Sequence, residues 1–228
     1  MQKNNVYIYW SKVEGPLSAG ALEGSFLSAR LRQRYRHYRT DMQRYLSMLG
    51  KLLLAYGLDD LQLRGRRTRL NLEYYPNGKP YLLKPPVPFS LSHSGHLVVC
   101  AISPDHTIGI DVQKQLPLRA GSERIFLNPA EIAQFPAETY LDLWCQKEAA
   151  YKAMSHWPGA RMTEFRFMGP HLLIQGEWAV RTYPLMLDEG FLACVALPAG
   201  APWRHETHFV PMAELLNVYE PHGEGVGL

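Results

Sequence analysis

A short apolar stretch of the chain contains an aspartate that is a candidate metal ligand. The stretch TIGIDVQ (107–113) alternates, so a strand would place its three branched apolar side chains on one face. Gly109, Asp111 and Gln113 share the other face, where the missing side chain of Gly109 lets a ligand or another backbone approach closely. An aspartate that ends a strand and satisfies a turn is the alternative, and this stretch alone leaves both interpretations open.

A second group of charged residues lies on a predicted helix. The segment YLDLWCQKEAAYKA (140–153) consists largely of strong helix formers. Glu148 and Lys152 are four residues apart and lie one above the other on such a helix, with Lys147 on the neighbouring row. Taken alone, the pattern is typical of an exposed ion pair worth about 0.3–0.5 kcal/mol.

Two other segments carry residues that suit phosphate binding. SHSG (92–95) is predicted to form a tight polar loop whose hydroxyls, imidazole and amides match a phosphate, although His93 as an ordinary loop histidine is the alternative. Arg30 and Arg34 would share one helical face and form a guanidinium clamp, with a solvated basic face as the equal alternative. The turn Pro76-Asn77-Gly78 places Lys79 directly after it.

The composition is that of a globular protein with an uneven distribution of basic residues. The chain has 228 residues, of which 46% are hydrophobic and 20% charged, enough for one domain or two small ones. The net charge is only +3, but arginines crowd residues 30–44 and 64–69, which suggests polyanionic ligands or partners. The three cysteines are far apart without CxxC or Cys/His spacing, so neither a structural zinc site nor a disulfide framework is expected.

No targeting or membrane-spanning segment is predicted from the sequence. The first ten residues, MQKNNVYIYW, lack the charged and long apolar regions of a signal peptide. No apolar run approaches the roughly 18 residues that a spanning helix needs. We therefore expect a cytoplasmic protein without a membrane partner.

The same order of elements is predicted in each half of the chain. The strands of the first half follow three predicted elements: a first strand at residues 6–10, a helix opening at 18–31 and an amphipathic helix at 41–56 that Gly57 ends. Gly50, inside the amphipathic helix, indicates close packing there. After residue 156, short apolar segments separated by Gly and Pro predict a second antiparallel sheet, followed by a short helix after Pro211.

Four motifs taken together resemble the Sfp-type 4′-phosphopantetheinyl transferases. They are GKPY (78–81), FSLSHSG (89–95), IGIDV (108–112) and WCQKEAAYK (144–152), in that order. The resemblance implies an α+β fold of two similar subdomains, 1–113 and 114–228, related by a pseudo-twofold axis. Each subdomain would consist of an antiparallel sheet packed with a long helix, and the active unit would be a monomer.

The resemblance also implies an activity. Enzymes of this family transfer the 4′-phosphopantetheine group of coenzyme A to a serine of an acyl or peptidyl carrier protein and release 3′,5′-ADP. Such carriers serve fatty acid, polyketide or nonribosomal peptide biosynthesis, and the sequence does not distinguish these pathways. Attack of a serine oxygen on a pyrophosphate needs positioning and cations more than a covalent nucleophile, which agrees with the residue types of the four motifs.

The family's functional residues fall on specific positions of this chain. The resemblance implies Mg²⁺, with Mn²⁺ as an alternative, held by Asp111 and Glu148. Glu148 would also accept the serine proton, and Lys152 would stabilise the leaving diphosphate. The residues expected on the phosphates of coenzyme A are Lys79, Ser92, His93, Lys152 and, on the 3′-phosphate, Arg34, with Arg30 a weaker candidate.

Gln113 is where the chain departs from the family pattern. The family's type sequence has an acidic residue two positions after the aspartate of the GID motif, and Gln113 stands there. Its amide oxygen can ligate a metal or hold a metal-bound water but adds no negative charge. We therefore count Gln113 as a third candidate metal ligand and expect Mg²⁺-dependent activity to be retained.

Two other functions are compatible with parts of the sequence. A non-catalytic relative that binds coenzyme A or carrier proteins would share the motifs, although every residue needed for transfer is present. An arginine-rich RNA-binding protein would explain the basic clusters but not the acidic residues and SHSG, and no aromatic RNA-binding signature is present. We therefore expect no nucleic-acid partner.

Overall fold

The computed structural model describes residues 4–14, 33, 40–64, 70–154, 161–174, 176 and 178–219. The predicted helix at 18–31 and the candidate phosphate ligands Arg30 and Arg34 lie outside these residues. Among the helices of the described part, none is long and apolar enough to cross a membrane.

The first sheet combines strands from both ends of the chain. Its order is β11-β1-β5-β4, and its strands are β1 (Val6–Lys12), β4 (Phe89–Ser94), β5 (Leu97–Ile102) and β11 (His205–Phe209). β1 pairs antiparallel with β5 and β5 with β4, whereas β11 runs parallel to β1. The expectation of a purely antiparallel sheet was therefore wrong for this one pair, because β11 joins the sheet from the far end of the chain.

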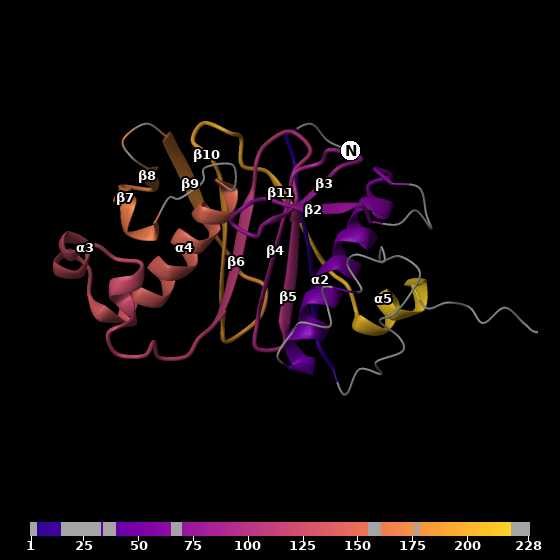
Figure 1. Cartoon of the computed structure of the whole chain (residues 1–228), viewed down its shortest axis with the longest axis horizontal. Coiled ribbons are helices and arrows are strands. Elements are labelled where there is room, and N and C mark those ends of the chain that lie inside the picture. The colour runs from indigo at the N-terminus through magenta and orange to yellow at the C-terminus, as the bar shows by residue number, and fades with distance from the viewer. Residues whose placement is uncertain are drawn as a thin grey trace, which may run out of the picture.

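Helix α2 (Asp41–Asp60) packs against the first sheet (Figure 1). It begins after Thr40, whose side chain accepts a hydrogen bond of 3.2 Å from the amide of Gln43. The helix continues past Gly57, so the predicted end at this glycine was wrong. A Cβ at Gly57 would lie 2.7 Å from both Ile102 and Tyr9, so this glycine permits the closest contact of the helix with the sheet.

Gly50 of α2 allows no unusually close contact. A Cβ there would lie 3.5 Å from Val98 and 3.7 Å from Leu91, which are ordinary packing distances. Gly50 is thus buried against the sheet at ordinary packing distances, and the tighter contact is at Gly57, two turns further along the helix.

The second sheet is antiparallel, as predicted, but it has five strands because the TIGIDVQ strand joins the four segments expected after residue 156. Helix α4 (Tyr140–Ala153) packs against it (Figure 1). The order is β6-β10-β9-β8-β7, and the strands are β6 (Gly109–Lys114), β7 (Phe165–Met168), β8 (His171–Ile174), β9 (Trp178–Leu185) and β10 (Phe191–Pro198). Helices and largely antiparallel sheets together make an α+β fold, which confirms the predicted class.

Short elements extend both layers. The hairpin β2 (Leu72–Tyr74) and β3 (Pro80–Leu82) encloses the predicted turn at Asn77 and Gly78. Helix α5 (Met212–Tyr219), predicted after Pro211, packs against α2. The remaining short helices lie around α4: η2 (Ser122–Ile125), α3 (Pro129–Gln134), η3 (Ala137–Thr139) and η4 (Met162–Glu164).

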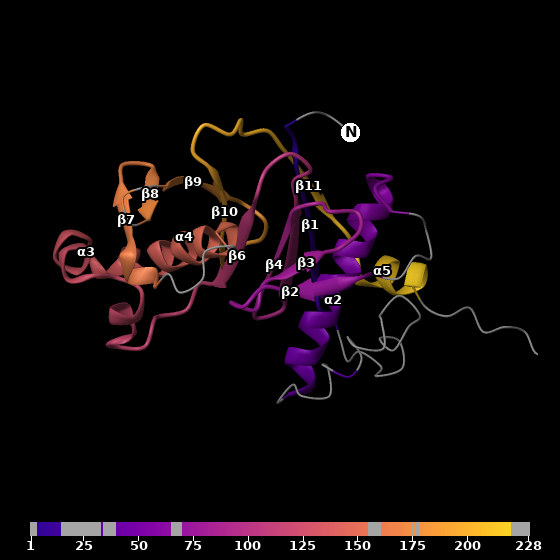
Figure 2. The same cartoon turned by 45° about the horizontal axis from the view of Figure 1, so that its top comes forward.

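The two sheets share a core, and their edge strands lie next to each other. Apolar side chains of β1 and β5 pack with those of β6 and β10, including the three branched residues of TIGIDVQ. Figures 1 and 2 both show β4 and β6 side by side, between α2 and α4. The pseudo-twofold axis and the division at residue 113 stay predictions; β6 belongs to the second sheet, while β11 and α5 return to the first.

Candidate active site

Asp111 of β6 is a buried carboxylate surrounded by hydrogen-bond donors. Its side chain is almost inaccessible, with 2% of the residue exposed. Oδ1 accepts hydrogen bonds from Ser92 Oγ at 2.7 Å and Lys152 Nζ at 2.6 Å, and Oδ2 accepts one from Gln113 Nε2 at 2.7 Å. The three donors both orient the Asp111 carboxylate and compensate its buried charge. The alternative interpretation, an aspartate that ends a strand and satisfies a turn, was therefore wrong.

Gly109 explains why Asp111 and helix α4 come together. A Cβ at this position would lie 1.8 Å from Ala149 O and 2.6 Å from Ala153 N. The space beside the strand is therefore filled by the backbone of α4, one of the two possibilities that the sequence left open. Any side chain at Gly109 would push the helix, and with it Lys152, away from Asp111.

Lys152 neutralises Asp111 instead of pairing with Glu148. Its ammonium donates to Asp111, to Ser92 Oγ at 3.0 Å and to the Ile110 carbonyl at 3.2 Å. The exposed Glu148–Lys152 ion pair, the simplest interpretation of the helix pattern, was therefore wrong. The pair that forms instead links α4 to β6 and is largely buried.

Glu148 is half-buried next to this pair. Burial raises the pKa of its carboxyl group, the charge of Asp111 raises it further, and Lys152 partly opposes both effects. Within the described ranges, the Glu148 carboxylate makes no hydrogen bond or ion pair. It is thus a second acidic group close enough to Asp111 to be affected by its charge, without a fixed donor of its own.

Lys79 approaches the site from the β2–β3 hairpin. Its ammonium donates to the carbonyl of Lys152 at 2.6 Å and to that of Ile108 at 2.9 Å. Burial, followed by repulsion from Lys152, lowers the pKa of Lys79 to about 7. In this arrangement Lys79 holds the last turn of α4 against the start of β6, and its expected phosphate contact stays a prediction.

His93 and Ser92 lie in a strand and not in a loop. Ser92, His93 and Ser94 complete β4, and the turn to β5 consists of Gly95, with φ +57°, and His96. The predicted loop was wrong because Ser94 still pairs with Leu97. The His93 side chain is exposed, and loss of hydration, then repulsion from Lys152, lowers the pKa of its imidazole.

Gln113 faces Asp111 as a hydrogen-bond donor. Its Nε2 points at Oδ2 of Asp111, so its amide group is oriented with the nitrogen toward the carboxylate. Its role as a third metal ligand through Oε1 stays a prediction. As a donor, Gln113 adds to the fixed orientation of Asp111 that Ser92 and Lys152 provide.

The donor set suits a hard divalent cation. Asp111 and Glu148 supply oxygen ligands, and the charge of Asp111 disfavours the ionised form of Glu148, a repulsion that a cation would relieve. The described residues contain no group of three or more His, Cys, Asp or Glu side chains arranged to hold a metal. Mg²⁺ commonly binds proteins through one or two carboxylates together with phosphates and waters, so two carboxylates are sufficient.

A second buried ion pair lies under α4, and no sequence pattern predicted it. Lys147 is completely buried and donates to Glu131 at 2.5 Å and to the Phe126 carbonyl at 2.8 Å. Glu131 also completes a capping box with Asn128 at the start of α3. The segment NPAE (128–131) carries the sequence signal of that cap, but nothing near it indicates Lys147 as the partner.

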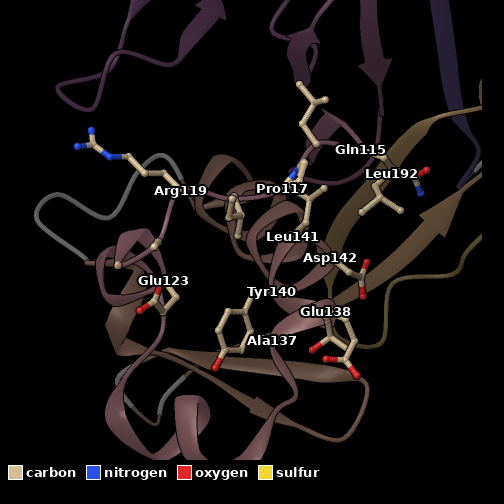
Figure 3. A pocket seen from close by; sticks show the side chains of 15 residues that line it. Gln115, Pro117, Arg119, Glu123, Ala137, Glu138, Tyr140, Leu141, Asp142 and Leu192 are labelled. Atoms are coloured by element: carbon tan, nitrogen blue, oxygen red, sulfur yellow. The ribbon is translucent and has the colours of Figure 1, made fainter.

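A large pocket lies apart from these residues. It has a volume of about 890 Å³ and is lined by the loop after β6 and the first turn of α4 (Figure 3). Glu123, Glu138 and Asp142 contribute acidic groups and Arg119 a basic one. None of the sequence-predicted site residues lines the pocket, and Asp142 is six residues before Glu148, about 9 Å along the helix.

Known proteins resemble the part of the chain that contains this site. The sequence pattern of the 4′-phosphopantetheinyl transferase superfamily matches residues 107–196, which include Asp111, Gln113, Glu148 and Lys152. A 4′-phosphopantetheinyl transferase of Bacillus subtilis is 29% identical over 161 residues, covering 64% of this chain and 68% of the relative. The 4′-phosphopantetheinyl transferase Sfp of Bacillus subtilis (strain 168) is 28% identical over 156 residues, with the same coverage of both chains.

Proposed function

This chain belongs to the 4′-phosphopantetheinyl transferase superfamily and is an enzyme of that class, and from this premise we propose its reaction. It transfers the 4′-phosphopantetheine group of coenzyme A to a serine of an acyl or peptidyl carrier protein and releases 3′,5′-ADP. The serine oxygen attacks the phosphorus that bears pantetheine, and the bond from that phosphorus to the leaving 3′,5′-ADP breaks. The serine proton must be accepted by a base.

The observation that carries this proposal is the cluster of Asp111, Lys152 and Glu148 where β6 meets α4. It combines two acidic groups with a lysine that is only partly buried, its side chain being 22% exposed. Lys79 and His93 add two further nitrogen groups from the first half of the chain, and Lys152 affects the pKa of both. The Lys152 ammonium and these hydrogen-bond donors around paired carboxylates suit a polyphosphate substrate and a divalent ion.

Asp111 and Glu148 would hold Mg²⁺, or Mn²⁺ in its place. The bound ion would supply positive charge to the diphosphate of coenzyme A. Asp111 is already fixed by its three donors, so little reorganisation of this carboxylate is needed on binding. Lys152 now compensates the charge of Asp111. A bound metal ion would take over this compensation, and the Lys152 ammonium would then be free to contact a phosphate.

Glu148 is our candidate for the general base. Its raised pKa brings the carboxyl group closer to neutral pH, where a base accepts a proton more readily. Lys152 would stabilise the charge that develops on the leaving 3′,5′-ADP. Lys79 and His93 would contact the phosphates of coenzyme A, and Arg34 the 3′-phosphate. With coenzyme A and a carrier protein as its only partners, the active unit would be a monomer.

Intact-mass measurement of a carrier protein tests the proposal. Incubation of apo carrier, coenzyme A and Mg²⁺ with the enzyme is expected to add one phosphopantetheine arm to the carrier, and chelation of the metal should prevent it. Isothermal calorimetry with coenzyme A alone measures binding of the donor independently of turnover. Binding of coenzyme A without a mass gain on several acyl and peptidyl carriers would contradict the transferase reaction.

A further inference from the structure

Three serine hydroxyls connect the edge strands of the two sheets. Ser90 Oγ accepts a hydrogen bond from the Ile110 amide at 3.1 Å, and Ser92 Oγ accepts one from the Val112 amide at 3.3 Å. Ser94 Oγ accepts a third, from the Lys114 amide at 2.9 Å. We call Ser90, Ser92 and Ser94 the serine ladder.

The ladder replaces main-chain pairing between the sheets. β4 is the edge strand of the first sheet and β6 that of the second. Because N–H groups alternate along a strand, every second amide of β6 faces away from its partner β10 and would otherwise be unpaired. Each hydroxyl bonds an amide 20 residues ahead, so β4 and β6 run in the same direction with a single register.

Ser92, the middle serine of the ladder, also bonds residues of the candidate site. Its hydroxyl donates to Asp111 Oδ1 and accepts from both the Val112 amide and Lys152 Nζ. A serine hydroxyl has one donor and two acceptor positions, so all of its capacity is used. Ser92 therefore orients Asp111 in this arrangement and has no hydrogen-bonding capacity left for a phosphate.

We propose that Ser90 and Ser94 are positioning residues for the transfer reaction, acting through β6 on the carboxylate of Asp111. Ser90 is buried at 1% exposure and bonds the amide that immediately precedes Asp111. Ser94 bonds β6 beyond Asp111, so the two serines hold the strand on both sides of the carboxylate. This inference rests on the proposed function, because its catalytic consequence concerns the metal and diphosphate that Asp111 would bind.

The test compares Ser90→Ala and Ser94→Ala with Ser11→Ala. Ser11 is also buried in a strand of the first sheet, and its hydroxyl has no hydrogen-bond partner among the described residues, so the same atom is removed without breaking the ladder. The main readout is Mn²⁺ affinity, measured by electron paramagnetic resonance without coenzyme A or carrier. Loss of a direct outer partner of a metal ligand weakens metal affinity by about 10–100-fold. Ser90 and Ser94 bond the strand and not Asp111 itself, so we expect at most about tenfold here.

Three further readouts distinguish positioning from general destabilisation. Hydrogen exchange should accelerate at the Ile110 amide in Ser90→Ala and at the Lys114 amide in Ser94→Ala. In transfer assays, the Mg²⁺ concentration for half-maximal rate should rise while KM for the carrier is unchanged. Ser94→Thr, which keeps the hydroxyl, should restore the wild-type values, and Ser11→Ala should not differ from wild type.

The possible outcomes separate this inference from the proposed function. Lower thermal stability with unchanged Mn²⁺ affinity and Mg²⁺ dependence would overturn the positioning role. Absence of transfer by the wild type, with Mn²⁺ affinity still dependent on the ladder, would overturn the transferase reaction alone. A wild type that neither transfers the arm nor binds Mn²⁺ would overturn both.

Discussion

Helix α4 contributes a lysine to each of two buried ion pairs, and the pairs differ in how completely they are enclosed. Lys147 has no exposed surface, and its partner Glu131 is held by a helix cap. Lys152 keeps 22% of its side chain exposed, and its partner Asp111 lies near a second carboxyl group with a raised pKa. The Lys147 pair is closed to any ligand, whereas the Lys152 pair is accessible to one.

Substitution of the accessible pair should abolish turnover with little loss of stability. We expect Asp111→Asn to lower the transfer rate by about 10²–10³-fold, the cost of removing one preorganised electrostatic group. The amide keeps the size of the carboxyl group, so thermal unfolding should change little. Initial rates by intact mass and thermal melting test both expectations, and a rate near that of wild type would remove Asp111 from the site.

Substitution of the enclosed pair should have the opposite effect. Lys147→Met leaves the Glu131 carboxylate buried without its cation and should lower the free energy of unfolding by about 3–5 kcal/mol. Urea denaturation measures this loss. The double variant Lys147→Met with Glu131→Leu is the matched control, since it removes both charges and should recover most of the stability.

The pH dependence of the transfer rate should show whether Glu148 is the general base. A base must be deprotonated to act, so the rate should rise with pH as Glu148 loses its proton; in the metal-free protein, burial raises the pKa of this carboxyl group above that of an ordinary glutamate, 4.5. We expect Glu148→Gln to lower the rate by about 10²-fold and to remove this acid limb. Rates measured between pH 5 and 8, at saturating Mg²⁺, provide the test; an unchanged limb would assign the proton transfer elsewhere.

Gln113→Glu tests how close the accessible pair is to the metal. A carboxylate at this position should lower the Mg²⁺ concentration for half-maximal rate by a few-fold, about 1 kcal/mol, because a negative charge is added beside Asp111. Titration of the transfer rate with Mg²⁺ measures the change. An unchanged titration would show that residue 113 does not touch the metal and only orients Asp111.

The last prediction concerns stability and Lys79. Its pKa is lowered from 10.5 to about 7 in the folded protein, so between these values the unfolded chain binds more protons than the folded one. The free energy of unfolding should therefore rise as pH increases from 7 toward 10.5. Urea denaturation of the free enzyme at pH 7 and 9 should show this rise in the wild type and not in Lys79→Met.

The sequence predicted the elements of the fold better than their contacts. Alternation and helical spacing located β6, α4 and the second sheet, because a strand or helix with one buried face has apolar residues at regular intervals. Gly57 was interpreted as a helix end, although close packing against Tyr9 and Ile102 requires it inside α2. A single glycine is compatible with both roles, and only the tertiary contact distinguishes them.

The motifs predicted which residues matter and not how they are held. Asp111 and Lys152 come from separate motifs, and nothing in either one indicates that they bond each other. Ser90 and Ser94 were missed because a hydroxyl that bonds an amide of another strand leaves no periodic pattern. The alternation of SLSHS (90–94) was the available signal, since it places all three hydroxyls on one face.

The parallel pairing of β1 with β11 has a consequence for how the protein is made. Val6 pairs with His205, so β1 is synthesised long before the strand that pairs with it. Until then one edge of β1 has unpaired amides and carbonyls, which is the kind of surface that associates with other chains. Synthesis must therefore proceed as far as β11 before the first sheet is complete, and that edge of β1 is open to association until then.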